Sequence, residues 1–411
     1  MNQVKAFKLV RTRDVLVAVL LVCGLQLYGQ RPDARNVPDA AAATHAESIA
    51  QASTTTPSTA AGKYITFDVP GDVNSTTPVS INDLGVITGS YGDNIGSDYH
   101  GFIRTIWGSF FTFDVPGAVY GTFPASINDF GAITGSYGDN IGSGYHGFVR
   151  TPWGAFVTFD VPDDVYGIYP SAMNARGDVV GYYYDLNFIQ HSFLREADGS
   201  LTTFDPPGTV RGSYATTITP DGVILGVYLH AEFGLDRAVG FRRDRSGNFT
   251  EVTGPGGLTG QDGRDTSFFG DVLSVNPQGE IAGSYFEPIT GNPFGGDFQV
   301  FLLSKDGQYT TFAAADYPPC CIFSSPTSIS PTGTVTGTLN DGLGIYRGFV
   351  RTPDGTLTLL DAPGAGTGLF QGTATIGITP WGLVAGVYVG PSGGNFFGVY
   401  KSHGFLWLPS R

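Results

Sequence analysis

The stretch INDLGVITGSYGDNIGSDYHGFIRT, residues 81–105, recurs almost unchanged as INDFGAITGSYGDNIGSGYHGFVRT at residues 127–151. The two copies begin 46 residues apart, and a shorter signature, Gly-x-apolar-x-Gly-x-Tyr, continues through the rest of the chain. It begins at Gly85, Gly131, Gly177, Gly222, Gly279 and Gly382, and with a different last letter at Gly333. A period of 45–57 residues is typical of solenoids, propellers and other repeat arrays.

Apolar segments of strand length surround each signature. The segments before it are centred on Ile81, Ile127, Met173, Ile218, Val275, Ile329 and Ile378. The segments after it, which carry a Gly-Phe pair or a relative of it, are centred on Phe102, Phe148, Phe193, Phe241, Phe301, Phe349 and Phe405. Segments related to TFD follow, with an apolar residue at Phe67, Phe113, Phe159, Phe204, Val252, Phe312 and Leu360. Together with the signature itself, the pattern predicts four short strands per repeat.

The TFD segments also alternate apolar and polar residues. The apolar sets are Ile65/Phe67/Val69, Phe111/Phe113/Val115 and Val157/Phe159/Val161. This alternation predicts that one face of each such strand points toward a core.

The two ends of the repeat region complement each other. One TFD strand, residues 64–69, precedes every other strand, and no such strand follows the last Gly-Phe segment. We therefore expect Tyr64–Val69 to complete the last unit, built from Ile378–Leu408, and to leave no open sheet edge at the junction. The prediction is an all-β, seven-bladed β-propeller of four-stranded blades, in which the N-terminal strand completes the last blade.

Composition agrees with this fold class and excludes a nucleic-acid partner. The 411 residues include 41% hydrophobic residues, 60 Gly and 26 Pro but only 14% charged residues, which favours short strands and tight turns around a sizeable core. The formal net charge is −14 and no long Lys/Arg run is present, so phosphate would be repelled.

The N-terminus resembles an export signal. Four basic residues precede residues 15–27, VLVAVLLVCGLQL, which are too few to span a bilayer about 30 Å thick as a helix. We predict a signal peptide over residues 1–29, a flexible Ala/Thr/Ser/Pro linker over 30–62 and a single propeller domain over 63–411. The mature chain is expected to be a monomer that is secreted or at the cell surface, with no transmembrane span after cleavage.

The three cysteines leave two questions open. Cys23 lies in the signal region, where lipidation is an alternative to simple cleavage. Cys320 and Cys321 are neighbours, so either a vicinal disulfide or two free thiols fits them.

The repeated glycines predict specific backbone conformations. In the INDxG motifs, the Gly at positions 85 and 131 suits a tight hairpin turn with a positive φ. The second glycine of the signature, as at Gly89 and Gly135, lies within a strand, where it allows a close approach of neighbouring chain.

These motifs resemble the HAF repeats of bacterial extracellular proteins. The resemblance rests on HGF, SIND.G.I.GSY and TFD.PG and covers roughly residues 63–411, although the tripeptide here has Gly at its centre. It implies export and a repetitive β-architecture, and it implies no particular reaction.

Two sets of repeated polar residues favour structural roles. The HGF position holds His100, His146, His191 and His403 in four repeats, and Gln299 or Arg347 in two others. Such replacement favours hydrogen bonding at a strand start over a metal ligand or a base. The TFD aspartates precede Pro/Gly turns and are expected to cap them; they are Asp68, Asp114, Asp160, Asp205 and Asp361.

A third polar set is a candidate metal site. Carboxylates at the exit of the second strand would lie on one face of the disc, and they are Asp93, Asp139, Asp185, Glu287 and Asp341. Oxygen ligands of this kind suit Ca²⁺ or a polyhydroxyl compound. Solubility and turn chemistry explain them equally well, so the expected cofactor is none, with Ca²⁺ as the alternative.

Long insertions point to the same face as a ligand surface. Residues 253–271, 286–297 and 313–325 carry the aromatic candidates for ligand binding, namely Phe268, Phe269, Phe286, Phe294, Tyr317 and Phe323. Aromatic residues on long loops over a rigid scaffold suit recognition of sugars or peptides, although mutual packing into a cap is the simpler alternative.

No catalytic residue is assigned. The sequence lacks HExxH, CxxC and GxxxxGK[ST]. The preferred hypothesis is a binding or interaction module for an extracellular polysaccharide or protein. The alternatives are an extracellular carbohydrate-active hydrolase or lyase, and a purely structural surface repeat.

Overall fold

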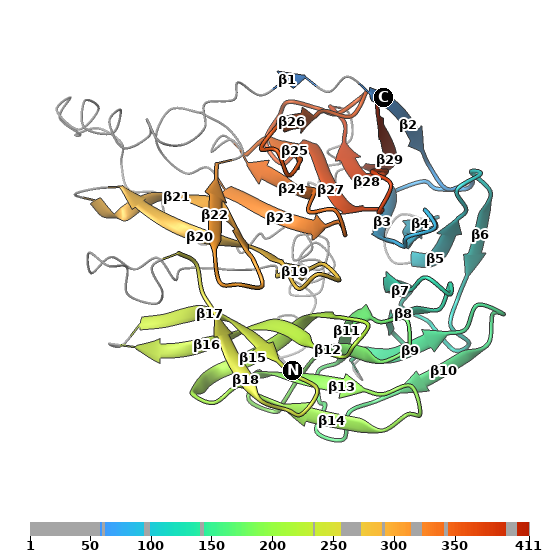
Figure 1. Cartoon of the computed structure of the whole chain (residues 1–411). Helices are drawn as coiled ribbons and strands as arrows, with labels where there is room; N and C mark the ends of the chain where they lie inside the picture. The colour runs from blue at the N-terminus through green and yellow to red at the C-terminus, as the bar shows by residue number, and fades with distance from the viewer. Residues whose placement is uncertain are drawn as a thin grey trace, which may run out of the picture.

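Figure 1 shows the computed structural model of the chain, which describes residues 58–59, 62–93, 99–139, 144–232, 235–255, 273–289, 292–313, 323–340, 344–391 and 401–410. Every regular element in these ranges is a strand, as predicted, and no helix in them is long and apolar enough to cross a membrane. The predicted signal peptide, most of the predicted linker, and Cys320 and Cys321 lie outside the described residues.

Consecutive strands pair antiparallel in groups of four, which we call units. Unit 1 contains β3 (Ser75–Ile81), β4 (Ile87–Gly92), β5 (Tyr99–Arg104) and β6 (Phe110–Phe113). Unit 2 contains β7 (Thr122–Ile127), β8 (Ile133–Tyr137), β9 (His146–Arg150) and β10 (Phe156–Phe159). Unit 3 contains β11 (Ile168–Met173), β12 (Val179–Tyr184), β13 (Gln190–Arg195) and β14 (Leu201–Phe204).

The same order continues through the second half of the chain. Unit 4 contains β15 (Thr209–Ile218), β16 (Ile224–Glu232), β17 (Leu235–Arg243) and β18 (Phe249–Val252). Unit 5 contains β19 (Ser274–Val275), β20 (Ile281–Ile289), β21 (Asn292–Leu303) and β22 (Tyr309–Phe312). Unit 6 contains β23 (Phe323–Ile329), β24 (Val335–Asn340), β25 (Tyr346–Arg351) and β26 (Leu357–Leu360).

Unit 7 joins the two ends of the described chain. Its strands are β27 (Gly372–Ile378), β28 (Val384–Val389), β29 (Ser402–Pro409) and β2 (Gly62–Phe67). The antiparallel pairing of β2 with β29 is the one expected from the complementary ends of the repeat. Figure 1 shows β2 beside β29, with unit 1 next to them. The short β1 (Ser58–Thr59) pairs parallel with β26.

The strand boundaries differ from those predicted. The first-strand residues expected at strand centres, such as Ile81 and Ile127, are the last residues of their strands, because the turn begins directly after them. The N-terminal strand spans Gly62–Phe67 rather than residues 64–69. Val69 has left the sheet, and its N–H donates to Thr76 Oγ1 at 3.0 Å in unit 1.

The outermost strand buries less than its alternation predicted. Phe113 is half-buried and Val115 is buried, but Phe111 is 57% exposed. Val157 is exposed at the equivalent position of unit 2. The prediction was wrong for these two residues because the fourth strand pairs on one side only, which leaves part of its apolar face in solvent.

The core of each unit is built around the Gly-Phe strand. The seven phenylalanines at its centre are all buried; they are Phe102, Phe148, Phe193, Phe241, Phe301, Phe349 and Phe405. The second signature glycine makes room for this ring, since a Cβ at Gly89 would lie 2.8 Å from Phe102 Cε1 and 2.1 Å from the Thr77 carbonyl. The predicted close approach is therefore confirmed.

The first turn of each unit has the predicted backbone. Gly85 and Gly131 have φ values of 79° and 81°, which is the left-handed region expected for the INDxG motif. The side chain of Asn82 closes this turn by accepting the Val86 N–H at 2.9 Å. The turn therefore depends on both the asparagine and the glycine.

The same asparagine also joins one unit to the next. Asn82 Nδ2 donates to the Asn128 carbonyl at 3.0 Å. The amide of Asn128 donates to the Asn174 carbonyl at 3.0 Å, and Asn174 reaches the Thr219 carbonyl at 3.2 Å. All three asparagines are buried, so these hydrogen bonds satisfy groups that water cannot reach.

A repeated cation–π contact also joins neighbouring units. The guanidinium of Arg150 in unit 2 lies 5.0 Å from the ring centre of Phe113 in unit 1. Arg104 of unit 1 lies 4.6 Å from Phe67 of β2, so the contact also crosses the junction between the two ends of the chain. Partly buried contacts of this kind contribute about 0.5–2 kcal/mol each.

Replacing Asn128 tests the link between units. Asn128→Ala removes the turn closure and the donor to Asn174, and it should lower the free energy of unfolding by about 1–3 kcal/mol because buried backbone groups lose their partners. Asn128→Thr is the matched control, since Thr219 holds this position in unit 4 and its Oγ1 accepts the Val223 N–H at 2.9 Å. Denaturant unfolding should place the Thr variant between the wild type and the Ala variant. Wild-type stability of both variants would contradict the proposed link.

Candidate functional site

Histidine and aspartate side chains meet at one end of the sheets, where the second strand of a unit leads into the third. His100 Nδ1 lies 2.9 Å from Asp114 Oδ1, and the pair joins β5 to the end of β6. The other pairs with the same geometry are His146–Asp160 at 2.6 Å, His191–Asp205 at 2.7 Å and His403–Asp68 at 2.8 Å. Because an ionised carboxylate can only accept, the imidazole Nδ1–H is the donor in each pair.

A second carboxylate faces the other nitrogen of three of these histidines. Asp93 Oδ2 lies 3.2 Å from His100 Nε2, and Asp139 Oδ1 lies 3.1 Å from His146 Nε2. Asp185 is farther away, at 3.7 Å from His191 Nε2. Units 1, 2 and 3 therefore each hold an imidazole between two aspartates. We call this row of groups, together with His403–Asp68 of unit 7, the histidine rim.

The tyrosine of the Gly signature fixes the plane of each imidazole. The ring centres of Tyr91 and His100 lie 5.3 Å apart, and those of Tyr388 and His403 lie 4.9 Å apart. Tyr137 and Tyr183 pack against the histidines of units 2 and 3 in the same way. The repeated tyrosine thus has a specific task, which is to hold the histidine toward its carboxylate.

The two flanking carboxylates favour protonation of His100 and of His146. Burial lowers the pKa of His100 because it disfavours the imidazolium, but hydrogen bonding to Asp114 and the charges of Asp114 and Asp93 outweigh burial and raise the pKa above 6.5. The same balance raises the pKa of His146 between Asp160 and Asp139. These histidines are therefore more readily charged than a free histidine.

In units 4, 5 and 6 the position of the rim histidine holds a different residue. In unit 6, Arg347 replaces the histidine, and its Nε donates to Asp361 Oδ1 at 2.9 Å. In unit 5, Gln299 Oε1 accepts the hydroxyl of Tyr285 at 3.1 Å. In unit 4, the two positions hold Val239 and Thr253, so no ion pair can form.

The rim presents acceptors rather than a free base. Nε2 of His100 and of His146 is buried beside Asp93 and Asp139, so a substrate cannot reach this nitrogen to give it a proton. The carboxylates are more open to solvent, as side chains of Asp114 and Asp160 are 52% and 59% exposed. Their outer oxygens can accept hydrogen bonds from hydroxyl or amide groups of a ligand.

The predicted metal residues are divided among the units. Asp93, Asp139 and Asp185 each pair with the histidine of their own unit. Among the residues that the structure describes, no group of three His, Cys, Asp or Glu side chains is arranged to hold a metal ion. Asp341 and the side chain of Glu287 lie outside the described part of the chain.

The structure describes only the backbone of some of the predicted aromatic ligand residues. Phe268, Phe269 and Tyr317 lie outside the described residues, as do the side chains of Phe286, Phe294 and Phe323. The backbone corrects one expectation, because residues 286–297 are largely not a loop. Phe286 pairs with Phe298 and Glu287 with Asp297, so β20 and β21 extend as one long hairpin.

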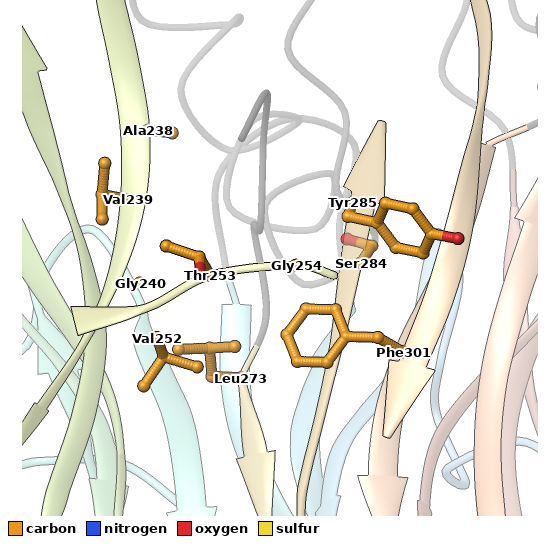
Figure 2. Close-up of a pocket in the computed structure, with 10 residues that line it drawn as sticks. All are labelled: Ala238, Val239, Gly240, Val252, Thr253, Gly254, Leu273, Ser284, Tyr285 and Phe301. Atoms are coloured by element: carbon orange, nitrogen blue, oxygen red, sulfur yellow. The ribbon is translucent and has the colours of Figure 1, made fainter. Parts of the chain in front are cut away.

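A small cavity lies where the histidine–aspartate pair is missing. Figure 2 shows Val239 and Thr253 of unit 4 on one side of it and Tyr285 and Phe301 of unit 5 on the other. Its volume is about 20 Å³, which is enough for about one water molecule. This cavity by itself is too small to hold a substrate.

The repeat also contains a sequence signal for the rim. Gly101 pairs with Phe113 across the β5–β6 hairpin, so the residues one step outside this pair, His100 and Asp114, must lie opposite each other. The 14-residue spacing between them recurs in units 2 and 3. Interpreted separately, the histidines and the TFD aspartates resemble strand-start and turn residues. When the hairpin register is combined with the repeat, each histidine is predicted to pair with the TFD aspartate of its own unit.

A histidine with a raised pKa stabilises the folded state only while it is protonated. The stabilisation by His100 and His146 should be complete below pH 6.5 and should be lost as the pH rises through their folded-state pKa. We expect the His100→Gln/His146→Gln variant, which introduces the residue type found at Gln299 of unit 5, to lose this pH dependence. The difference should be below about 1 kcal/mol per histidine, because water reaches the rim.

Denaturant unfolding between pH 5.5 and 9 measures this difference. The wild type should lose stability relative to the variant as the pH rises. Parallel pH profiles for the two proteins would show that the rim histidines are not selectively protonated in the folded state.

Comparison with known proteins shows the fold and not the family. No protein-family model matches the chain, and no curated protein matches it. Among solved structures, streptogramin B lyase aligns with a TM-score of 0.52 and 15% identity, over 84% of this chain and 97% of that one. Virginiamycin B lyase from Staphylococcus aureus aligns with a TM-score of 0.50 and 14% identity, over 84% and 99%.

A third similar structure is that of a longer protein. Puromycin hydrolase aligns with a TM-score of 0.51 and 13% identity, over 85% of this chain and 55% of that one, so this chain spans about half its length. Identities this low establish the architecture alone. The all-β chain, with its four-stranded antiparallel units, has a β-propeller-like fold.

Proposed function

We propose that the chain is a seven-bladed β-propeller whose N-terminal strand completes the last blade. Each of units 1 to 7 corresponds to one blade in this proposal. Support comes from the pairing of β2 with β29, which joins the first part of the described chain to the last, and from the stacking of Arg104 on Phe67, which joins unit 1 to unit 7. Such closure leaves no long sheet edge for unwanted pairing.

We further propose that this propeller is a binding module, secreted or held at the cell surface. The observation that carries the proposal is the histidine rim, because similar polar groups recur in consecutive units along one end of the sheets. Rigid strands hold these groups, so a ligand would meet preorganised acceptors. The resemblance to HAF repeats supports an extracellular location.

The chemistry of the rim suits a ligand rich in hydroxyl or amide donors. Half-exposed carboxylates of units 1 and 2 offer oxygens for such groups. An extracellular carbohydrate or a protein loop supplies donors of this kind. Ca²⁺ is an alternative bridging partner for the same oxygens, and its involvement is part of the test.

An enzyme is the second candidate function. The main alternative is an extracellular carbohydrate-active hydrolase or lyase; two of the structures that share this fold are named a lyase and a hydrolase, and neither name refers to a carbohydrate. The burial of Nε2 in His100 and His146 favours binding over acid–base catalysis at the rim itself. Release of reducing sugar from a bound glycan would favour the enzyme. A purely structural repeat is the third possibility.

A glycan-array screen of the full chain, with Ca²⁺ and with chelator, tests the binding proposal. We expect saturable binding that weakens about tenfold or more in an Asp93→Asn/Asp139→Asn variant, because hydrogen bonds to charged acceptors contribute about 1.5–3 kcal/mol. Asp306→Asn is a matched control, since Asp306 lies in a turn at the opposite end of unit 5.

Each result of the screen has a distinct meaning. Binding that persists in the Asn variant would place the ligand elsewhere on the chain. Loss of binding with chelator would add a metal ion to the site. A folded sample that binds no glycan would rule out a carbohydrate from the array as the ligand.

A further inference from the structure

Large apolar side chains gather at the end of the sheets opposite the histidine rim. Antiparallel pairing places the turn between strands one and two of a unit at the same end as the turn between strands three and four. We call this end the turn face. In units 7, 1 and 2 its exposed apolar residues are Leu84, Ile106, Trp107, Phe130, Trp153 and Trp381.

The two tryptophans between strands three and four are the most exposed of these. Trp107 is 90% exposed and Trp153 is 93% exposed, and the two occupy the same position of the repeat, 46 residues apart. Isolated exposed apolar residues are common on protein surfaces. An almost fully exposed tryptophan that recurs in adjacent units instead indicates a surface that binds a partner.

The fold does not require tryptophan at this position. The equivalent turn residues of units 3, 5 and 6 are Asp198, Asp306 and Asp354. Asp198 accepts the Ser200 N–H at 2.8 Å, and Asp354 accepts the Thr356 N–H at 3.0 Å, so aspartate closes the turn with a hydrogen bond. Units 1 and 2 have a large apolar ring where units 3 and 6 have this closing group.

The turns between strands one and two show the same contrast. Their exposed apolar residues are Leu84, Phe130 and Trp381 in units 1, 2 and 7. The equivalent residues are polar in units 3 to 6, namely Arg176, Asp221, Gln278 and Thr332. The apolar residues are thus confined to three consecutive units.

Contacts join the turns between strands one and two of units 7, 1 and 2. Trp381 Nε1 donates to the Asp83 carbonyl at 3.1 Å, which joins unit 7 to unit 1. The Asp83 N–H donates to Asp129 Oδ1 at 2.9 Å, which joins unit 1 to unit 2. A Cβ at Gly85 would lie 3.1 Å from Ile106 Cδ1 and 3.3 Å from Trp381 Cζ2, so these side chains are neighbours.

The charges on this surface and on the whole chain disfavour an anionic partner. The five turns of this surface contain Asp83 and Asp129 but no Lys or Arg, and the whole chain has a net charge of −14. Arg104 and Arg150, the last residues of β5 and β9, are stacked on Phe67 and Phe113. Anionic lipid surfaces and acidic polymers would therefore be repelled.

An uncharged sugar polymer fits the remaining chemistry. A pyranose ring has a face of C–H groups that packs on a flat aromatic ring, and hydroxyls at its edge that donate to carboxylates. Trp107 and Trp153 provide the same ring twice at equivalent places in adjacent units, which suits a ligand that itself repeats.

We propose that the turn face of units 7, 1 and 2 binds a neutral polysaccharide, with Trp107 and Trp153 stacking on its sugar rings. The site is distinct from the histidine rim, and it rests on the proposed function only in that the chain is a binding module. Asp83 and Asp129 lie in the same turns as Leu84 and Phe130 and are exposed, so their carboxylates can accept hydrogen bonds from sugar hydroxyls.

The test uses the full chain and a Trp107→Asp/Trp153→Asp variant. This variant has the residue that units 3, 5 and 6 use, so it should fold and unfold at the same or a higher denaturant concentration. Phe111→Thr is the matched control, because it removes an exposed aromatic residue from a strand and gives the residue found at Thr202 in unit 3.

Binding is measured by co-sedimentation with cellulose and chitin, and by the shift of tryptophan emission with soluble xylan, laminarin and dextran. We expect the wild type and Phe111→Thr to bind at least one of these polymers, and the double Asp variant to bind it tenfold or more weakly. An Asp93→Asn/Asp139→Asn variant in the same assay distinguishes this surface from the rim.

Other outcomes would overturn the proposal. If the wild type binds none of the five polymers, the neutral polysaccharide is wrong. If the double Asp variant binds as the wild type does, this surface is not the site, although the binding function stands. Tryptophan-dependent binding to phosphatidylcholine vesicles, or tryptophan-dependent dimers in sedimentation equilibrium, would assign the surface to a lipid or to a second copy of the chain instead.

Discussion

The side-chain amide of a buried asparagine, placed in the first turn of a unit, is the interaction on which the rest of the structure depends. Its oxygen closes its own turn and its nitrogen donates to the next turn, as Asn82 and Asn128 do. One side chain thus sets both the local conformation of a hairpin and its distance from the neighbouring hairpin. Because the amide is buried, any displacement between units would leave a donor or an acceptor without a partner.

The link is strongest where the repeat is most regular. Asn82, Asn128 and Asn174 form a continuous series through units 1, 2 and 3, and Asn276 makes the same contact from unit 5 to unit 6. Units 4, 6 and 7 use Thr or Ser at this position, which closes the turn with its hydroxyl oxygen and has no amide to offer. Apolar packing and the arginine–phenylalanine contacts must hold those units to their neighbours.

The asparagines hold the turns between strands one and two. Other residues at the two ends of the sheets can therefore differ from unit to unit. One end has the histidine rim, whose tyrosines, histidines and aspartates recur with small changes from unit to unit. The other end has turns whose exposed residues are apolar in units 7, 1 and 2 and polar elsewhere. A side chain at a turn apex has few packing partners, so its identity can change without loss of the fold. Such positions are where a repeat protein can acquire a binding surface.

The sequence by itself determined the features that depend on a few neighbouring residues. The repeat period, the all-β class, the positive φ of Gly85, the close approach at Gly89 and the joining of the first strand to the last could all be predicted, since glycine stereochemistry and apolar alternation act locally. Tertiary structure decided which side chains contact one another and which stay exposed. The pairing of His100 with Asp114 depends on hairpin register, and the exposure of Phe111 depends on its strand having one partner. The hydrogen bond from Trp381 to Asp83 requires the two ends of the chain to meet, because these residues are almost 300 positions apart and touch only where unit 7 lies beside unit 1.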